Sequence, residues 1–229
     1  MKRLMFVFGL FLLAFSLLAQ TAVTPVGEGT EAIPYQIATW QNLYWISQNS
    51  SAWDKHFIQT ADIDFADANP AINTWNDSTG WSPIGNDSTR FTGKYNGNNK
   101  TITGLFINRP NAYYQGFWGL TNSESEIKNL GLISVNVTGR RNTGSLVGLN
   151  EIGSIINCYS TGNVSGNYTG NGGLVGYNSQ GNINNSCSSA NVNSPYYSGG
   201  LVGINSDGII TSCYSTGNVS ALRHCAGGI

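Results

Sequence analysis

Hydrophobic positions in the second half of the chain recur in short groups that Gly, Asn and Ser residues separate. The pattern is clearest in residues 172–192, which read GGLVGYNSQGNINNSCSSANV, and similar units fill residues 144–164 and 199–219. Aliphatic residues at the same place in each unit are separated by 28, 27 and 28 residues; they are Leu146, Leu174, Leu201 and Ile229. Self-similarity at such a period is the signature of a solenoid.

The apolar groups within each unit are too short for helices, and the residues between them are those that favour turns. Fully extended, a unit of this length would reach roughly 90 Å, so it must fold back on itself as one coil. The coils are expected to stack at the ~4.8 Å spacing of parallel strands. The sequence therefore predicts an all-β chain that forms a parallel β-helix, or solenoid.

Less regular copies extend the predicted solenoid toward the N-terminus. Phe117 lies 29 residues before Leu146, and Ile127 lies 28 residues before Ile155. We expect about five coils over residues 91–229, the last of which ends in mid-repeat, as in a fragment of a longer protein.

Residues 20–90 are expected to form an N-terminal lid and leading strands. A short helix is predicted, with Thr39 as its cap and an apolar face of Trp40, Leu43, Tyr44 and Ile46. Because an open end of a β-helix exposes unpaired backbone groups, we expect this helix to cover it. A strand over residues 57–65 and a Trp-bearing loop over residues 67–87 follow.

Residues 1–19 have the pattern of a secretory signal peptide. Lys2 and Arg3 precede an apolar run from Leu4 to Leu18, and the expected cleavage point is Ala19-Gln20. The run is shorter than the ~20 residues that a bilayer span needs, and no second such run follows. We therefore expect a secreted or cell-surface protein without a transmembrane segment after signal cleavage.

The net charge of the mature chain does not favour a nucleic-acid partner. Removal of two basic residues leaves 11 − 2 = 9 basic and 12 acidic residues, a net charge near −3. A protein that binds nucleic acid usually carries an excess of basic residues, so we expect no nucleic-acid partner.

Four segments together resemble a known repeat family. They are WSPIG from Trp81, FTGKYNGNNKTITGL from Phe91, GFWG from Gly116 and the GGLVG copies. The chain from about Trp40 onward resembles the GLUG-motif repeat family of bacterial secreted and surface adhesin-like proteins, which also occurs in the non-catalytic part of some immunoglobulin A peptidases. The resemblance implies a β-helical surface protein and does not by itself fix an activity.

Few residues of the repeats have the chemistry that catalysis needs. From Asn142 onward the charged residues are Glu151, Asp207 and Arg223, with His224 able to gain a charge. Glu151 and Asp207 occupy similar positions two coils apart, about 9.6 Å, near the upper end of the carboxyl separation in inverting glycosidases. A polysaccharide hydrolase or lyase is therefore an alternative, but a non-enzymatic protein is favoured. With only His56 and His224 there is no HExxH motif for a zinc protease.

No cofactor or metal is expected. Asp62, Asp64 and Asp67 have the oxygen ligands that calcium prefers, yet they lack the glycine-punctuated loop of known calcium motifs. The favoured interpretation is a solvated strand edge that faces the N-terminal helix.

The cysteines of the repeats are predicted to be unbridged. In the gap-free alignment of the units, Cys158 and Cys213 are equivalent and Ser186 lies between them, while Cys187 is one residue out of phase. Residues two coils apart would be separated by about 9.6 Å, beyond the roughly 7 Å limit for a disulfide. Cys225 has no assigned partner.

A column of asparagines is predicted along the solenoid. In each coil one Asn comes directly before the Val that recurs with the repeat; the four are Asn136, Asn163, Asn191 and Asn218. Stacked side-chain amides can form hydrogen bonds from coil to coil, which favours a structural ladder. The functional alternative is a sugar-binding row.

Aromatic and basic residues occupy the corner before each repeat. They are Tyr113, Tyr114, Arg140, Arg141, Tyr168, Tyr196 and Tyr197, and Arg223-His224 follow at the last corner. Because Tyr and Arg make effective contact surfaces, this corner stripe is the predicted binding site for a glycan or a host or neighbouring-cell surface protein. The remaining alternative is the structural stalk of a larger, truncated surface protein.

Overall fold

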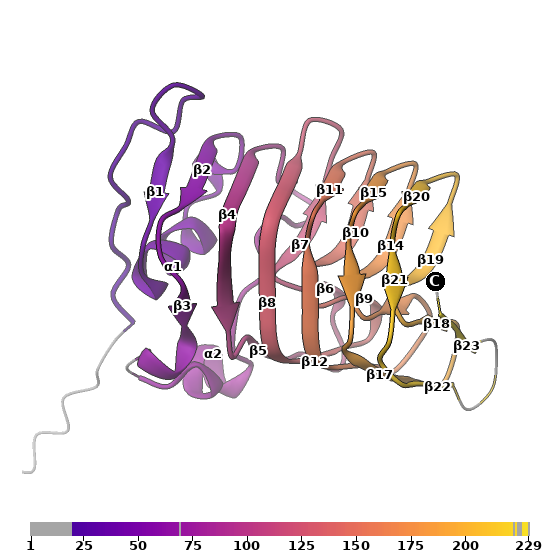
Figure 1. Cartoon of the computed structure of the whole chain (residues 1–229). Helices are drawn as coiled ribbons and strands as arrows, with labels where there is room; N and C mark the ends of the chain where they lie inside the picture. The colour runs from indigo at the N-terminus through magenta and orange to yellow at the C-terminus, as the bar shows by residue number, and fades with distance from the viewer. Residues whose placement is uncertain (1–19, 69, 222, 224–225, 229) are drawn as a thin grey trace, which may run out of the picture.

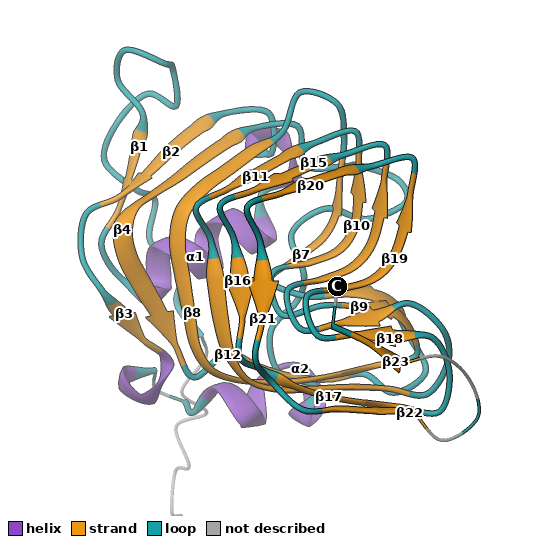
Figure 2. Cartoon of the chain, turned by 45° about the vertical axis from the view of Figure 1, so that its right-hand side comes forward, coloured by secondary structure: helices purple, strands orange, loops and turns teal. Residues whose placement is uncertain are grey.

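The computed structural model describes residues 20–68, 70–221, 223 and 226–228 of the chain. Strands follow one another around an axis and form a parallel β-solenoid of about five turns (Figure 1), which confirms the predicted fold. The coils stack in chain order, so each coil packs only against the coil before it and the coil after it (Figure 2).

The largest sheet runs the full length of the solenoid. Its main path contains β1 (Tyr35–Ile37), β2 (His56–Gln59), β4 (Lys94–Thr103), β8 (Glu126–Gly139), β11 (Ser154–Ile156), β15 (Asn182–Asn184) and β20 (Ile209–Thr211). Further strands join beside this path: β3 (Ile63–Asp64), β5 (Phe106–Asn108), β12 (Tyr159–Gly166), β16 (Cys187–Ser188), β17 (Asn191–Ser194), β21 (Tyr214–Ser215) and β22 (Val219–Ala221). The leading strands β1 and β2 thus belong to the same sheet as the repeats.

Two smaller sheets close the coil. The four-stranded sheet contains β7 (Trp118–Thr121), β10 (Val147–Glu151), β14 (Val175–Ser179) and β19 (Val202–Ser206). The five-stranded sheet contains β6 (Tyr113–Gln115), β9 (Arg141–Thr143), β13 (Asn171–Gly172), β18 (Ser198–Gly199) and β23 (Ala226–Gly227). All pairings between the named strands are parallel, as a solenoid requires.

The register of the strands confirms the alignment of the units. Ile155 pairs with Ile127 and Ile183, and Val164 pairs with Val137 and Val192. The repeat of 27 or 28 residues therefore places identical side chains in columns that point into the core.

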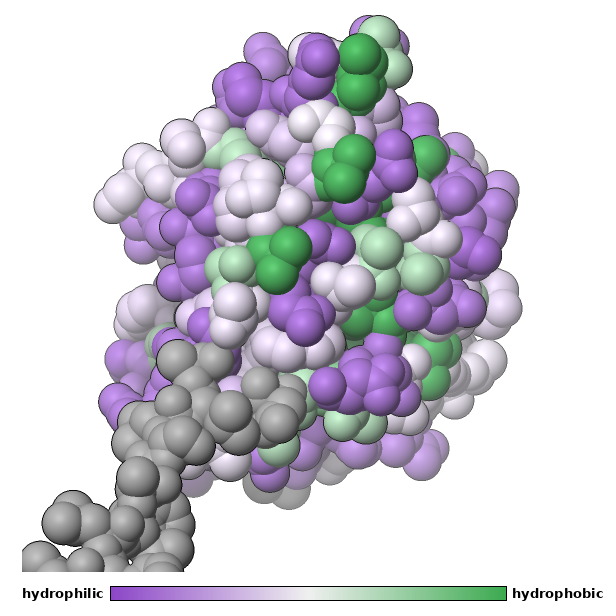
Figure 3. All heavy atoms as spheres, turned by 90° about the vertical axis from the view of Figure 1, so that its left-hand side faces the viewer, coloured by the Kyte–Doolittle hydropathy of each residue, from purple (hydrophilic) through white to green (hydrophobic). Residues whose placement is uncertain are grey.

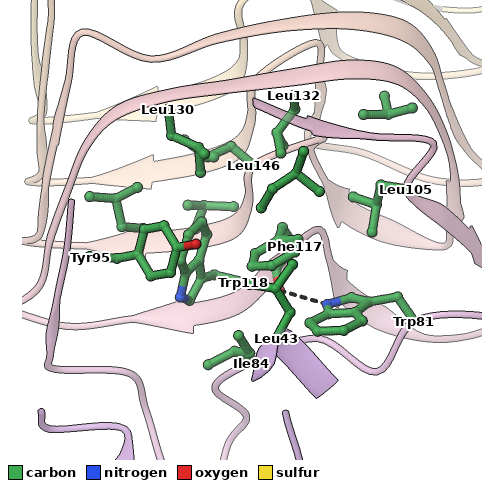
Figure 4. Close-up of a cluster of buried hydrophobic side chains, with 14 of the residues drawn as sticks. Leu43, Trp81, Ile84, Tyr95, Leu105, Phe117, Trp118, Leu130, Leu132 and Leu146 are labelled. Atoms are coloured by element: carbon green, nitrogen blue, oxygen red, sulfur yellow. Dashed lines mark hydrogen bonds between the residues drawn. The ribbon is translucent and has the colours of Figure 1, made fainter. Parts of the chain in front are cut away.

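The predicted N-terminal helix is confirmed as α1 (Trp40–Gln48). Thr39 accepts a hydrogen bond from the Asn42 backbone, and the Asn42 side chain accepts one from the Thr39 backbone, so the two residues form a capping box. Leu43 and Ile46 are buried, and Leu43 points into the core (Figure 4).

The strand predicted over residues 57–65 is divided into β2 and β3. Gln59, the last residue of β2, is fully buried, and its Nε2 atom donates to the backbone oxygens of Ala61 and Thr101, 2.8 Å each. These bonds hold the backbone in a turn at residues 60–62, so one continuous strand is not possible.

The predicted Trp-bearing loop contains helical turns. They are the 3₁₀ turns η2 (Phe65–Asp67) and η3 (Ile72–Thr74) and the short helix α2 (Trp75–Ser78); a further 3₁₀ turn, η1 (Ser50–Ala52), follows α1. Trp75 and Trp81 are fully buried. The loop therefore supplies core residues to the first coils.

The core changes character along the axis. Its N-terminal part is aromatic: Trp81 stacks on Phe117 with ring centroids 4.8 Å apart, and Trp81 Nε1 donates to the Phe117 oxygen at 3.0 Å (Figure 4). Tyr95 is also buried and donates to Gln59 Oε1 at 3.0 Å, and burial raises the pKa of Tyr95 well above its ordinary value. Toward the C-terminus, columns of Leu, Ile and Val replace the aromatic rings.

On the N-terminal face, hydrophobic residues are scattered among hydrophilic ones (Figure 3). Among the helices that the structure describes, each is too short or too polar to traverse a lipid bilayer. The predicted signal peptide, residues 1–19, lies outside the described residues.

Candidate functional site

The five-stranded sheet positions the corner stripe. Gln115, Thr143, Asn171 and Ser198 lie opposite one another in successive coils and are all buried. The two or three residues before each of them form the corner, so their side chains project from the same edge of the solenoid. The strands of this sheet lie near the C-terminal label in Figure 2.

The structure brings most of the stripe together in two pairs. The Arg140 guanidinium carbon lies 5.2 Å from the centre of the Tyr113 ring, within the range of a cation–π contact. Tyr168 lies 5.3 Å from Tyr196, ring centre to ring centre. Tyr113 also contacts the ring of Tyr114 at 6.1 Å.

Exposure shows which of these side chains a ligand can reach. Tyr113, Tyr168 and Tyr197 are 46%, 45% and 45% exposed, which is high for such large side chains. Arg140 and Arg141 are exposed as well. Arg223 is exposed at the last corner, whereas His224 lies outside the described residues.

The ring partner of Tyr168 is Tyr196 rather than Tyr197. The Tyr197 oxygen accepts hydrogen bonds from the backbone of Gly170 and Asn171, at 3.1 and 3.4 Å. These bonds hold Tyr197 next to β13, and Tyr196 is the residue whose ring contacts that of Tyr168, at an interplanar angle of 57°.

The predicted asparagine column lies on the outer surface. Asn163 pairs in register with Asn136 and Asn191, and all four predicted members are exposed. Asn191 Nδ2 donates to Asn163 Oδ1 at 3.4 Å, and the Asn218 backbone donates to Asn191 Oδ1 at 3.1 Å. The column is therefore held by few and long side-chain bonds.

A second asparagine ladder, which is buried at Asn150 and Asn178 and exposed at Asn205, was missed by the sequence analysis. Asn150 Nδ2 donates to Asn178 Oδ1 at 2.8 Å, and Asn178 Nδ2 donates to Asn205 Oδ1 at 2.7 Å. Thr121 Oγ1 begins the ladder with a bond of 2.7 Å to Asn150 Oδ1. The signal was the recurring LVGxN, in which Asn follows Leu by four residues.

The cysteines lie in the predicted phases and are free. The Cys158 backbone donates to Ser186 Oγ at 3.1 Å, and the Ser186 backbone donates to Cys213 Sγ at 3.4 Å, so these three residues form one column. Cys187 points elsewhere and pairs in register with two tyrosines, Tyr159 and Tyr214. Burial raises the pKa of the Cys158 thiol to about 12. Cys225 lies outside the described residues.

Glu151 and Asp207 lie at similar positions two coils apart, since Glu151 pairs with Ser179 and Ser179 pairs with Ser206, the residue before Asp207. Arg90 Nε lies 3.2 Å from Glu151 Oε2, so the two side chains form an ion pair. Asp207 is exposed and has a left-handed backbone, φ 56°, as has Gln180 at the same corner of the preceding coil. Asp tolerates this conformation, which accounts for its presence at a turn.

Two of the three aspartates near the N-terminal helix accept hydrogen bonds from the backbone. Asp62 Oδ1 accepts from the Thr101 backbone at 2.8 Å, and Asp64 Oδ1 accepts from the Ala66 backbone at 2.8 Å. Within the described part of the chain, no three His, Cys, Asp or Glu residues gather as they would to hold a metal ion.

Comparison with known proteins agrees with the repeat assignment. Residues 139–165 and 194–220 match the model of the GLUG motif, and these segments include Arg140, Arg141, Tyr196 and Tyr197. The chain is 37% identical over 153 residues to a protein named Halomucin from Haloquadratum walsbyi, and 36% identical over 121 residues to a candidate Gly-rich membrane protein of Evansella cellulosilytica. These matches cover 64% and 52% of the chain but only 2% and 13% of the two relatives.

A solved structure shares the fold. A candidate immunoglobulin A1 protease from Bacteroides ovatus superposes with a TM-score of 0.65 at 24% sequence identity, over 89% of this chain and 62% of that one. Together with the motif match, this confirms the predicted resemblance to GLUG-motif repeat proteins.

Proposed function

We propose that this chain, which carries GLUG-motif repeats, belongs to a secreted or cell-surface protein that binds extended glycans along the corner stripe without catalysing a reaction on them. The signal-peptide pattern of residues 1–19 and the names of the two relatives support the location. Because the chain spans a small part of both relatives, the binding assigned here is that of one module.

One observation carries the proposal: exposed Tyr and Arg side chains from successive coils gather on a single edge. Tyr113 with Arg140 and Tyr168 with Tyr196 form contact pairs next to the paired strands of the five-stranded sheet. A sugar ring has an apolar C–H face and hydroxyl groups at its rim. Aromatic rings cover the face, and guanidinium and phenol groups form hydrogen bonds with the rim.

The geometry favours an extended ligand over a compact one. The stripe crosses the four coils from Tyr113 to Tyr197, and three intervals of ~4.8 Å give a length of about 14 Å. A surface of this length can contact several sugar units of one chain. Because the corners are short bends between paired strands, little conformational entropy is lost on binding.

Alternative assignments of the charged residues are less well supported. Glu151 is engaged by Arg90, and Asp207 belongs to a turn. The stripe itself contains no carboxylate, so it supplies neither the acid nor the base that glycoside hydrolysis needs. Binding without cleavage is therefore the favoured activity.

The experiment compares wild type with Tyr168→Ala and Arg141→Ala for retention on a glycan array and for thermal stability. Tyr214→Ala is the matched control, since Tyr214 is 59% exposed but lies on β21, in the largest sheet. We expect the stripe variants to lose at least tenfold in affinity, because removal of an anchor residue costs ~2 kcal/mol. Their free energies of unfolding should change by less than ~0.5 kcal/mol. Equal retention of both stripe variants and wild type would contradict the proposal.

A further inference from the structure

A loop insertion lies beside the N-terminal end of the corner stripe. Ile84 pairs with Trp118, and Phe91 pairs with Thr121. The two paired positions are 91 − 84 = 7 residues apart in the earlier coil but only 121 − 118 = 3 residues apart in the next coil. The four extra residues bulge out of the coil.

The insertion is held in a defined conformation. Asn86 Oδ1 accepts from the backbones of Ser88 and Thr89 at 3.0 Å each, an arrangement that fixes a tight turn. At its end, the ion pair between Arg90 and Glu151 fastens the loop to β10. The Asp87 carboxylate at the tip forms no hydrogen bond or ion pair with any residue that the structure describes, and it is exposed.

Between this loop and the stripe lies a hollow of about 210 Å³. Its lining combines the loop with the first corner: Pro83, Gly85, Asn86, Asp87, Tyr113, Tyr114, Gln115 and Leu120. Sites for drug-sized ligands usually begin at ~300 Å³, so this hollow accepts a smaller group, of the size of one sugar ring.

Tyr114 has an unfavourable backbone conformation at this hollow. Its φ is 56°, in the left-handed region that large side chains avoid. The residues opposite it in the next two coils are Asn142, φ 54°, and Gly170, φ 75°, which adopt this conformation at lower cost. A bulky residue here costs ~1 kcal/mol or more, and such strain concentrates at functional sites.

We infer that the hollow between the 85–90 loop and the corner stripe binds one pyranose ring of a neutral glycan, at the end of the chain that the stripe holds. The inference rests on the proposed function and names the subsite where the ligand is anchored. Tyr113 and Tyr114 cover the apolar face of the sugar, and Asp87 accepts hydrogen bonds from its hydroxyl groups. A carboxylate acceptor suits a neutral sugar and repels an acidic one.

The test measures binding of four probes by calorimetry: methyl glucoside, methyl galactoside, methyl mannoside and N-acetylglucosamine. We compare wild type with Asp87→Asn and Tyr114→Asn, and Asp207→Asn serves as control because Asp207 is also exposed but lies at another corner. At least one probe should bind wild type, and both hollow variants should lose tenfold or more in affinity. Tyr114→Asn should melt at the same or a higher temperature than wild type, since Asn relieves the strain at this position.

The outcomes separate the two proposals. If Tyr168→Ala and Arg141→Ala weaken glycan retention while Asp87→Asn and Tyr114→Asn bind every probe like wild type, the hollow is not a subsite and the stripe still is. If wild type retains glycans but binds none of the probes, the subsite is also refuted. Retention of proteins alone on an array that carries both classes would overturn both proposals.

Discussion

At the scale of single residues, the backbone conformation at the corners explains why the chain is rich in Asn. Each coil turns sharply at a residue with a left-handed backbone, and one column of such residues has φ values of 55°, 52°, 52° and 53°: Asn129, Asn157, Asn185 and Ser212. Asn adopts this conformation more readily than most residues, so the abundance of Asn reflects geometry and not low complexity. Tyr114 and Ile152 are the bulky exceptions, with φ of 56° and 66°.

The buried thiol of Cys158 leads to a prediction about reactivity. Because burial raises its pKa to about 12, the thiol stays protonated at pH 8, and thiols react as thiolates. In native protein at pH 8 we expect iodoacetamide to modify the half-buried Cys187 at least tenfold faster than Cys158, as measured by peptide mass spectrometry.

The unfolded protein serves as the control for this experiment. Without reductant, Cys158, Cys187 and Cys213 should all be modified once the chain is unfolded, because none is bridged to another. A disulfide between any two of them, or equal rates in the native state, would show that the columns are misplaced.

At the scale of the coil, hydrogen bonds between equivalent residues define the register. The ladder of Asn150, Asn178 and Asn205 is buried at its first two members. It adds a hydrogen bond within each coil that it crosses, because each amide also donates to a backbone oxygen three residues later, as Asn178 does to Gly181 at 2.9 Å. A buried polar group is tolerated when its bonds are satisfied, and this ladder satisfies them by repetition.

Substitution of the middle residue of the ladder should be strongly destabilising. Asn178→Ala removes two amide–amide bonds and leaves the Gly181 oxygen without its donor, so we expect a loss of about 2–4 kcal/mol in the free energy of unfolding. Asn163→Ala, in the exposed column, should cost less than ~0.5 kcal/mol. Urea denaturation measures both. Similar losses for the two variants would contradict the assignment of the buried column as the structural one.

The repeat made it possible to predict which residues form columns, but not whether a column is buried or exposed. Equal spacing of Ile127, Ile155 and Ile183 was enough to place them opposite one another, and Thr39 marked the start of α1 through simple capping chemistry. The sequence analysis chose the exposed asparagines over Asn150 and Asn178, because period alone gives the column and not its burial. A polar residue inside the core becomes favourable only when its neighbours in space complete the bonds.

The candidate subsite could not be predicted from the sequence for a related reason. The four-residue insertion before Phe91 falls in a stretch without repeat, so nothing in the sequence aligned Asp87 with Tyr114. The stripe itself was predictable because it recurs with the period. The exact ring pairs were not, since they depend on backbone bonds such as those of Tyr197.

At the scale of the whole molecule, the solenoid combines an aromatic N-terminal part with a repetitive C-terminal part. Rings such as Trp81, Phe117 and Trp118 fill the first coils, next to α1 (Figure 4). The coils that begin near Leu146 and Leu174 each bury one Leu, one Ile and two Val residues. The rigid stack presents different surfaces along its edges. The central claim is that one of these edges, the corner stripe, is where a glycan binds.

Hydrogen exchange read by mass spectrometry tests this claim most directly, with the glycan that the array retains at saturating concentration. The account predicts slower backbone exchange in residues 112–115, 140–143, 168–171 and 195–199, and unchanged exchange in β11, β15 and β20 on the largest sheet. Protection of these three strands with no change at the corners would contradict it.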